Sequence, residues 1–184
     1  MTVSAPNPVV RYLSRLTGAL AGDLSDADLL EAIERLLPHL ADGAEIAAKM
    51  TPALRRQWLA AMSSLKERAK TLVEIINGAR FLFADRPIPL DEKAEGILNQ
   101  DARTLLRGVA DELATVEPWT TETTERAVRG FAERQGAKLG AVAQPLRAAL
   151  TGRTTSPGIF EVLTVLGKSE SLGRLADRIA PSAP

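Results

Sequence analysis

Hydrophobic residues recur three and four positions apart along most of the chain, which is the spacing of a helix with one buried face. The clearest case follows Ser25, whose side-chain oxygen can cap a helix, with acidic residues in the first turn that complement the helix dipole. Pro38 and His39 are expected to end or kink this helix, because an internal proline removes a backbone hydrogen bond. Its expected buried positions are Leu29, Leu30, Ile33, Leu36 and Leu37.

The same spacing predicts helices in the rest of the chain. Thr51 can cap a helix whose first residue is Pro52, and Ser64 is expected to start a new helix that runs to Phe83. The expected helices lie at 8–20, 51–62, 64–83, just after Asp91, at 101–116, from Thr120 or Thr121 to Gly136, at 139–150, at 159–167 and from Ser169 onward. Because long β-branched runs are missing, we predict an all-α fold of about nine or ten short helices and no sheet.

A proline-rich segment divides the pattern into two parts. Pro87 and Pro89 favour an extended connection, because proline disfavours the helical conformation of the residue before it. We therefore predict two packed helical subdomains, forming a helix bundle or an α-helical cage. The first covers residues 1–84 and ends in a basic helix, the connection covers 85–92, and the second subdomain covers 93–184.

Composition narrows the function classes. The chain has 184 residues and no cysteine, which excludes disulfides and thiolate chemistry. His39 is the only histidine, so a histidine-based metal cluster is impossible and a Ser-His triad is not expected. No apolar run has the length of a membrane span, and the first ten residues lack the pattern of a signal peptide. These features fit a cytoplasmic protein without a membrane partner.

Charge is neutral in total but alternates along the chain. Residues 23–45 hold one basic and seven acidic residues, and 46–80 hold seven basic and two acidic. Residues 81–125 hold four basic and ten acidic, and 126–174 hold eight basic and three acidic. If both basic blocks face the same way, they could form a phosphate-binding surface. Ordinary solvent-exposed helices would give the same counts, so charge alone leaves both interpretations open.

Catalytic signatures are absent from the sequence. There is no Walker-type glycine-rich loop, no GxGxxG after a strand and no HExxH. The neighbouring carboxylates of Asp91 and Glu92 point in different directions on a helix, which favours solvation or capping over acid–base catalysis. His39 is expected at the surface, and Trp58 in the core. Trp119 precedes a helix cap, where packing is a better explanation than stacking on a base.

The most unusual segment is KLGAVAQPLRAALTGRTTSPGIFEVLTVLGKSESL, in which the loop 151–158 separates two apolar helices. Its KLG, QPLR, LTG, SPG and LGK elements resemble the C-terminal segment of bacterial glutamyl-tRNA synthetases, a class I family. The runs LKERAKTLVEIINGARFLFADRPIPLDEKA and PWTTETTERAVRGFAERQG are also similar to that family. The resemblance covers residues 60–175. Residues 1–60 match poorly, and neither the HIGH-type nor the KMSKS-type signature of the catalytic domain is found.

The resemblance implies a function in tRNA recognition. The helical half of the family binds the anticodon stem and loop of the glutamate tRNA, and one arginine of its basic helix reads an anticodon base. Motif position makes that residue Arg68, and it places Arg147 and the Thr-Gly turn near the anticodon loop. The candidate tRNA-binding residues are Arg68, Lys66, Lys70, Lys138, Arg147, Thr151, Arg153 and Ser156.

General chemistry agrees with these candidates. A guanidinium offers a planar fork of donors for a base edge or a phosphate, and single-stranded loops expose their bases. The turn Ser156–Gly158 precedes a helix, whose N-terminal N–H groups can bind a phosphate. The simpler interpretation of the loop is a C-cap followed by an N-cap, with Gly152 and Pro157 serving the architecture.

Two further functions remain open at this point. The chain is either a piece of a longer protein or a free-standing relative of the helical half. The alternative to a tRNA-binding module is a protein-interaction module that kept the same fold. Whether it is part of an enzyme depends on a catalytic domain supplied in cis or in trans. ATP and Mg²⁺ would belong to that missing domain, so no cofactor is expected in this chain. An independent enzyme has no motif in its favour.

Overall fold

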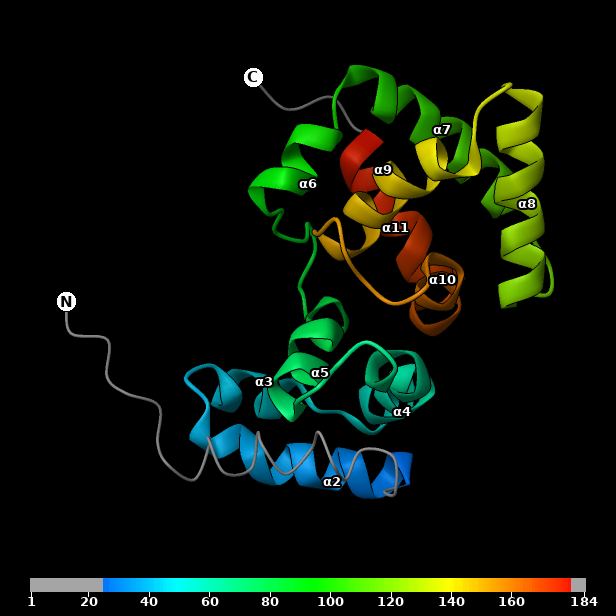
Figure 1. Ribbon diagram of the computed structural model, residues 1–184. Helices are drawn as coiled ribbons and strands as arrows, with labels where there is room; N and C mark the ends of the chain where they lie inside the picture. Colours follow the sequence, from blue (N-terminus) through cyan, green and yellow to red (C-terminus); the bar gives the residue numbers. More distant parts are fainter. Residues whose placement is uncertain (1–24, 180–184) are drawn as a thin grey trace. The chain divides into compact units, whose positions relative to one another are not determined.

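The computed structural model describes residues 25–179, and in that range the chain forms α-helices and two short 3-10 turns without a strand (Figure 1). The predicted all-α class is confirmed. The chain divides into two compact units, residues 1–83 and 84–184. The helix expected at 8–20 lies outside the described residues. No described helix is both long enough and apolar enough to cross a membrane.

The first unit has four described α-helices. They are α2 (Asp26–Leu36), α3 (Gly43–Lys49), α4 (Pro52–Lys66) and α5 (Leu72–Ala79), with 3-10 turns η1 (Leu37–His39) and η2 (Arg80–Leu82). Ser25 caps α2 by accepting a hydrogen bond from the Asp28 N–H, and Thr51 caps α4 by accepting from Leu54. Because α2 ends at Leu36, just before Pro38, the predicted end of this helix is confirmed.

Trp58 lies at the centre of this unit. Its side chain is fully buried and meets Phe83 edge to face, with ring centroids 4.9 Å apart. The Lys49 ammonium donates to the Phe83 carbonyl oxygen at 3.0 Å, which fixes the end of the unit against α3. The predicted core role of Trp58 is confirmed. The five leucine and isoleucine positions expected to be buried in α2 and η1 are also buried.

The helix predicted over 64–83 is wrong. α4 continues through Ser64 to Lys66, the chain turns at 67–71, and α5 begins at Leu72. Thr71 causes the restart, because its hydroxyl accepts a hydrogen bond from the Glu74 N–H at 3.1 Å. The turn contains neither glycine nor proline, so no strong breaker marked it in the sequence.

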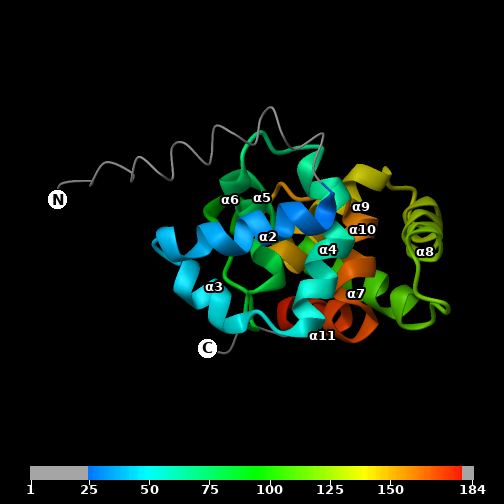
Figure 2. The same cartoon turned by 90° about the horizontal axis from the view of Figure 1, so that it is seen from below.

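The second unit has six α-helices among its described residues. They are α6 (Glu92–Ile97), α7 (Gln100–Ala114), α8 (Thr121–Arg134), α9 (Leu139–Thr151), α10 (Ile159–Leu166) and α11 (Lys168–Ile179). α9 is the central helix of this unit and packs against α6, α7, α8, α10 and α11. α8 lies at the outer edge of the unit in both views (Figures 1 and 2).

The predicted helix caps of this unit are confirmed. Asp91 accepts from the Ala94 N–H at 2.7 Å and starts α6. Thr120 caps α8, and Gly136 follows the end of that helix with φ 62°, a conformation that favours glycine. Trp119 donates its indole N–H to the Leu163 carbonyl oxygen of α10 at 2.9 Å, which agrees with the expected packing role and adds a partner that the sequence did not indicate.

Candidate nucleic-acid interface

The loop that follows α9 begins at a glycine that no other residue could replace without strain. Gly152 ends α9 in the left-handed conformation, with φ 72°, and its N–H donates to the Ala148 carbonyl oxygen at 3.0 Å. A Cβ atom on Gly152 would overlap the carbonyl oxygen of Pro89. The Gly152 carbonyl in turn accepts from the Asp91 N–H at 2.9 Å. The loop is therefore fastened to the proline-rich segment on both sides of Gly152.

Arg147 braces the same loop from within. Its Nη1 donates to the carbonyl oxygen of Pro157 at 2.7 Å and to that of Ser156 at 3.2 Å, and also contacts the Ser156 hydroxyl. The side chain is half-buried in the last turns of α9. A guanidinium that holds two carbonyl oxygens fixes the path of the loop, so Arg147 has a structural role in this site.

The loop hydroxyls are also engaged within the chain. Thr151 is buried, and its hydroxyl donates to the Arg147 carbonyl oxygen at 2.9 Å. The Ser156 hydroxyl donates to the Pro157 carbonyl oxygen at 2.8 Å. Arg153 differs, because its side chain is exposed. Of the predicted residues in this loop, Arg153 is the exposed cation that a phosphate or a base could reach.

The N-terminus of α10 already holds a carboxylate of the chain itself. Glu161 Oε2 accepts a hydrogen bond from the Gly158 N–H at 3.1 Å and so occupies the start of α10. A negative charge at this end of the helix repels a second anion and satisfies one of the N–H groups. The phosphate site expected at 156–158 is therefore less favourable than the sequence indicated.

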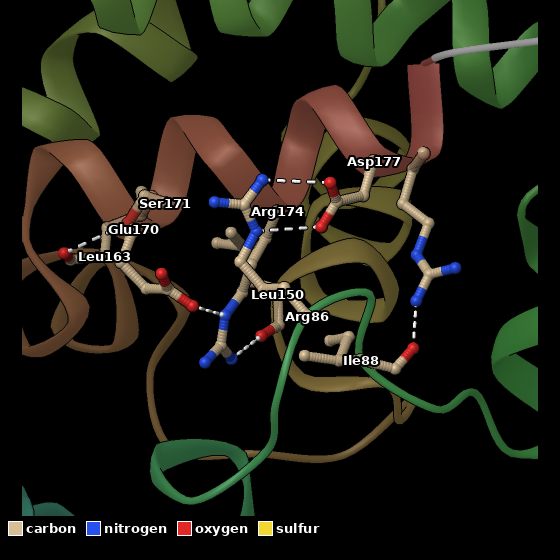
Figure 3. Close-up of polar contacts among 9 residues, drawn as sticks. Arg86, Ile88, Leu150, Leu163, Glu170, Ser171, Arg174 and Asp177 are labelled. Atoms are coloured by element: carbon tan, nitrogen blue, oxygen red, sulfur yellow. Dashed lines mark hydrogen bonds and ion pairs between the residues drawn. The ribbon is translucent and has the colours of Figure 1, made fainter.

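An arginine–carboxylate cluster that sequence reasoning missed joins α11 to the end of α9 and to Arg86 (Figure 3). Arg174 of α11 is 2% exposed; its Nη1 donates to the Leu150 carbonyl oxygen at 2.7 Å and its Nε to Glu170 at 2.7 Å. Arg86 binds Asp177 through two hydrogen bonds of 2.8 and 2.9 Å. The helical spacing could have revealed that Arg174 is buried. Arg174 shares the buried face of α11 with Ser171 and Leu175.

The pKa values of the cluster follow from these contacts. Burial lowers the pKa of the Arg174 guanidinium, and the Glu170 carboxylate opposes that change. The hydrogen bonds from Arg86 lower the pKa of Asp177, and the same bonds raise the pKa of Arg86. Both shifts of the Arg86–Asp177 pair favour its charged forms, so its hydrogen bonds join a cation and an anion at neutral pH.

The predicted residues of the first unit gather around the turn at 67–71. Lys66 pairs with Asp26 at 2.6 Å, so its ammonium connects the end of α4 to the start of α2. Arg68 and Lys70 are both exposed in the turn itself. The Lys70 N–H donates to Glu74 at 2.6 Å, which helps to hold the turn against α5.

The structure brings some of the predicted residues together and separates others. Arg147, Thr151, Arg153 and Ser156 form one group in the loop after α9. Lys138 is exposed at the other end of α9, about 20 Å away for a helix that rises 1.5 Å per residue. The described residues hold no cluster of acidic or histidine side chains suited to a metal ion.

Comparison with known proteins defines the class of this chain. Residues 24–179 match the family described as "Anticodon binding domain". The chain therefore belongs to the anticodon binding domain family. Because this match takes up most of the chain, the catalytic domain expected of a full synthetase is not in it.

The similar proteins are glutamate–tRNA ligases. The chain is 56% identical over 166 residues to the glutamate–tRNA ligase of Bradyrhizobium sp. (strain BTAi1), covering 90% of this chain and 35% of that protein. It is 56% identical over 168 residues to glutamate–tRNA ligase 1 of Xanthobacter autotrophicus, covering 91% and 36%. The chain thus spans about a third of the length of these relatives. The resemblance predicted from the motifs is confirmed, but its predicted limits of 60–175, with a poor match before residue 60, are wrong, because the family match begins at residue 24 and the similarity covers 90% of the chain.

The solved structures show the same fold at lower identity. A glutamate tRNA ligase from Elizabethkingia meningosepticum superposes with a TM-score of 0.71 and 22% identity, covering 89% of this chain and 30% of that one. The glutamate–tRNA synthetase of Elizabethkingia anophelis gives a TM-score of 0.68, 23% identity, and coverage of 89% and 30%.

Proposed function

We propose that this chain is the anticodon-binding module of a glutamate–tRNA ligase and that it binds the anticodon stem-loop of the glutamate tRNA. The observation that carries the proposal is the family match over 24–179, together with relatives that are named for this ligase and are 56% identical. The catalytic domain, with its ATP and Mg²⁺, is a partner of the module in cis or in trans. The module acts in the cytoplasm, where tRNA is charged.

The exposed cations are the residues that touch RNA in this proposal. Arg68 reads a base of the anticodon loop, because its fork of donors matches a base edge and unstacked bases present those edges. Lys70, Lys138 and Arg153 supply charge to phosphates. All four side chains are exposed, which supports this assignment.

The remaining candidates hold the structure around these cations and do not touch RNA in this proposal. Arg147, Thr151 and Ser156 shape the loop that carries Arg153, through the hydrogen bonds within the chain. Lys66 holds α2 against the end of α4 through Asp26. These residues affect RNA binding by fixing the positions of the exposed cations.

A titration with two RNAs tests the function. A fluorescein-labelled stem-loop carrying the glutamate anticodon and one carrying an unrelated anticodon on the same stem are titrated with the 184-residue chain at several salt concentrations. We expect tighter binding of the glutamate stem-loop and an affinity that falls as salt rises, because phosphate contacts release counterions. Absence of binding at low salt would instead favour a protein-interaction module. Equal affinity for both RNAs would contradict anticodon recognition.

A further inference from the structure

The last carbonyl groups of α9 need partners, because a helix leaves its C-terminal carbonyls without intrahelical hydrogen bonds. Leu150 lies two residues before Gly152, and its carbonyl oxygen accepts from Arg174 at 2.7 Å. Arg174 is 2% exposed, so this donor reaches the end of α9 from the inside of the unit. Glu170 holds the other side of the guanidinium at 2.7 Å and fixes its orientation.

The same helix, α11, also holds the proline-rich segment. Arg86 is bound by Asp177, and its guanidinium lies directly against the backbone of α11 where a Cβ on Gly173 would overlap it (Figure 3). Arg178 donates to the carbonyl oxygen of Ile88. α11 therefore contacts both segments that meet at Gly152, the end of α9 and residues 86–89.

A buried arginine is an expensive way to stabilise a fold. Removing a guanidinium from water costs several kcal/mol, and apolar residues of similar volume often do as well. The contact of Arg174 with a carbonyl at the root of the loop, and not only with Glu170, indicates a geometric role. Its directional hydrogen bond sets where α9 ends and where the loop begins.

We infer that Arg174 is a positioning residue of the RNA-binding site, which acts through the Leu150 carbonyl to fix the loop that presents Arg153. This inference rests on the proposed function, since it names how one part of that site is held. Arg174 itself does not touch RNA. Its effect on binding passes through Arg153, whose side chain is exposed in that loop.

Two variants and one control test the loop without RNA. Arg174→Met keeps the volume and removes the donors, and Arg174→Lys keeps one donor. Val128→Ala is the control, because Val128 is fully buried in α8 and its truncation lowers stability away from the loop. Amide hydrogen exchange is followed at Asp91, whose N–H binds the Gly152 carbonyl. We expect exchange at Asp91 to rise about tenfold more in Arg174→Met than in Val128→Ala at matched thermal stability.

Binding of the glutamate stem-loop supplies the second test, in the same 184-residue chain. We expect Arg174→Met to weaken binding about fivefold, and to have little further effect when Arg153→Ala is already present, because residues acting through one another are not additive. Arg174→Lys should restore part of the affinity. If Arg174→Met does not fold, Arg174→Lys carries both tests, with intermediate losses expected.

The outcomes separate the inference from the proposed function. Unchanged exchange at Asp91, or an affinity loss that adds fully to that of Arg153→Ala, overturns the positioning role while tRNA binding stands. If the unmodified chain does not bind the stem-loop, the proposed function fails and the positioning role in RNA binding fails with it. The exchange result would then still show whether Arg174 orders the loop.

Discussion

The loop after α9 and the turn between α4 and α5 are both basic, yet they differ in how far their polar side chains are exposed. In the loop, Arg147, Thr151 and Ser156 all donate to oxygen atoms of the chain, and only Arg153 among the predicted residues there is exposed. In the turn, Arg68 and Lys70 are exposed. A basic, hydroxyl-rich sequence therefore does not tell whether its polar groups face a ligand or hold the backbone.

The largest effect is expected where the loop meets the proline-rich segment. Gly152→Ala should lower the free energy of unfolding by about 3 kcal/mol, because it adds left-handed strain and an overlap with the Pro89 carbonyl. Gly136→Ala is the matched control, since Gly136 has φ 62° but open space around it, and it should cost about 1 kcal/mol. Chemical denaturation measures both. Equal losses would show that the loop is not packed as described.

Variants of Arg147 and Arg153 separate the structural role from the RNA-binding role within the loop. Arg147→Met removes hydrogen bonds from a charged donor to the Ser156 and Pro157 carbonyls, so it should cost about 2 kcal/mol of folding free energy. Arg153→Met, in the same loop but exposed, should change stability by about 0.5 kcal/mol or less. Thermal unfolding of both variants checks this. If the Arg147→Met chain is as stable as the unmodified chain, Arg147 does not brace the loop.

In the turn, we expect a variant of Arg68 to affect RNA binding more than stability. Arg68→Ala should lower the melting temperature only slightly, because the side chain is exposed, and should weaken binding of the glutamate stem-loop about tenfold, as expected for loss of a base contact. Arg35→Ala is the control, because Arg35 is an exposed arginine of α2 whose partner is Glu31. Equal loss of affinity in the two variants would show that Arg68 contributes only a non-specific positive charge.

The smallest effect concerns acid stability. The folded-state pKa of Asp177 is lowered by Arg86, so its carboxylate adds stability that is present above the unfolded pKa of about 3.9 and is lost as pH falls through the lower folded value. Asp177→Asn should lower stability at pH 7 by about 0.5 kcal/mol, as expected for a partly exposed ion pair, and this difference should disappear below about pH 4 as the carboxylate of the unmodified chain is protonated. Unfolding curves between pH 2 and 7 measure it, with pH values chosen about one unit apart. A profile identical to that of the unmodified chain would contradict the Arg86–Asp177 contact.

Much of the fold could be predicted from the sequence because its signals are local. Ser25, Thr51 and Asp91 cap helices through hydrogen bonds to residues three positions away, and the buried stripes follow the helical period. The turn at 67–71 escaped prediction because it depends on Thr71 and Glu74 and not on a glycine or proline. A threonine cap such as Thr71 is hard to recognise in the sequence, although in the structure its hydrogen bond starts α5.

The site was harder to predict because its contacts join distant segments. Motif position identified Arg147, but its partners at Ser156 and Pro157 depend on the path of the loop. Arg174 reaches Leu150 across 24 positions, and no residue pattern names that partner. The assignment of the tRNA-binding residues stays a prediction that only RNA can test.

Intermolecular NOEs in the complex of this chain with the glutamate anticodon stem-loop test the central claim most directly. We predict NOEs from the side chains of Arg68, Lys70 and Arg153 to RNA protons, and none from the guanidinium of Arg147. NOEs from Arg147 and the hydroxyl-bearing loop residues, with none from the turn at 67–71, would contradict this division between a structural loop and an exposed RNA-binding turn.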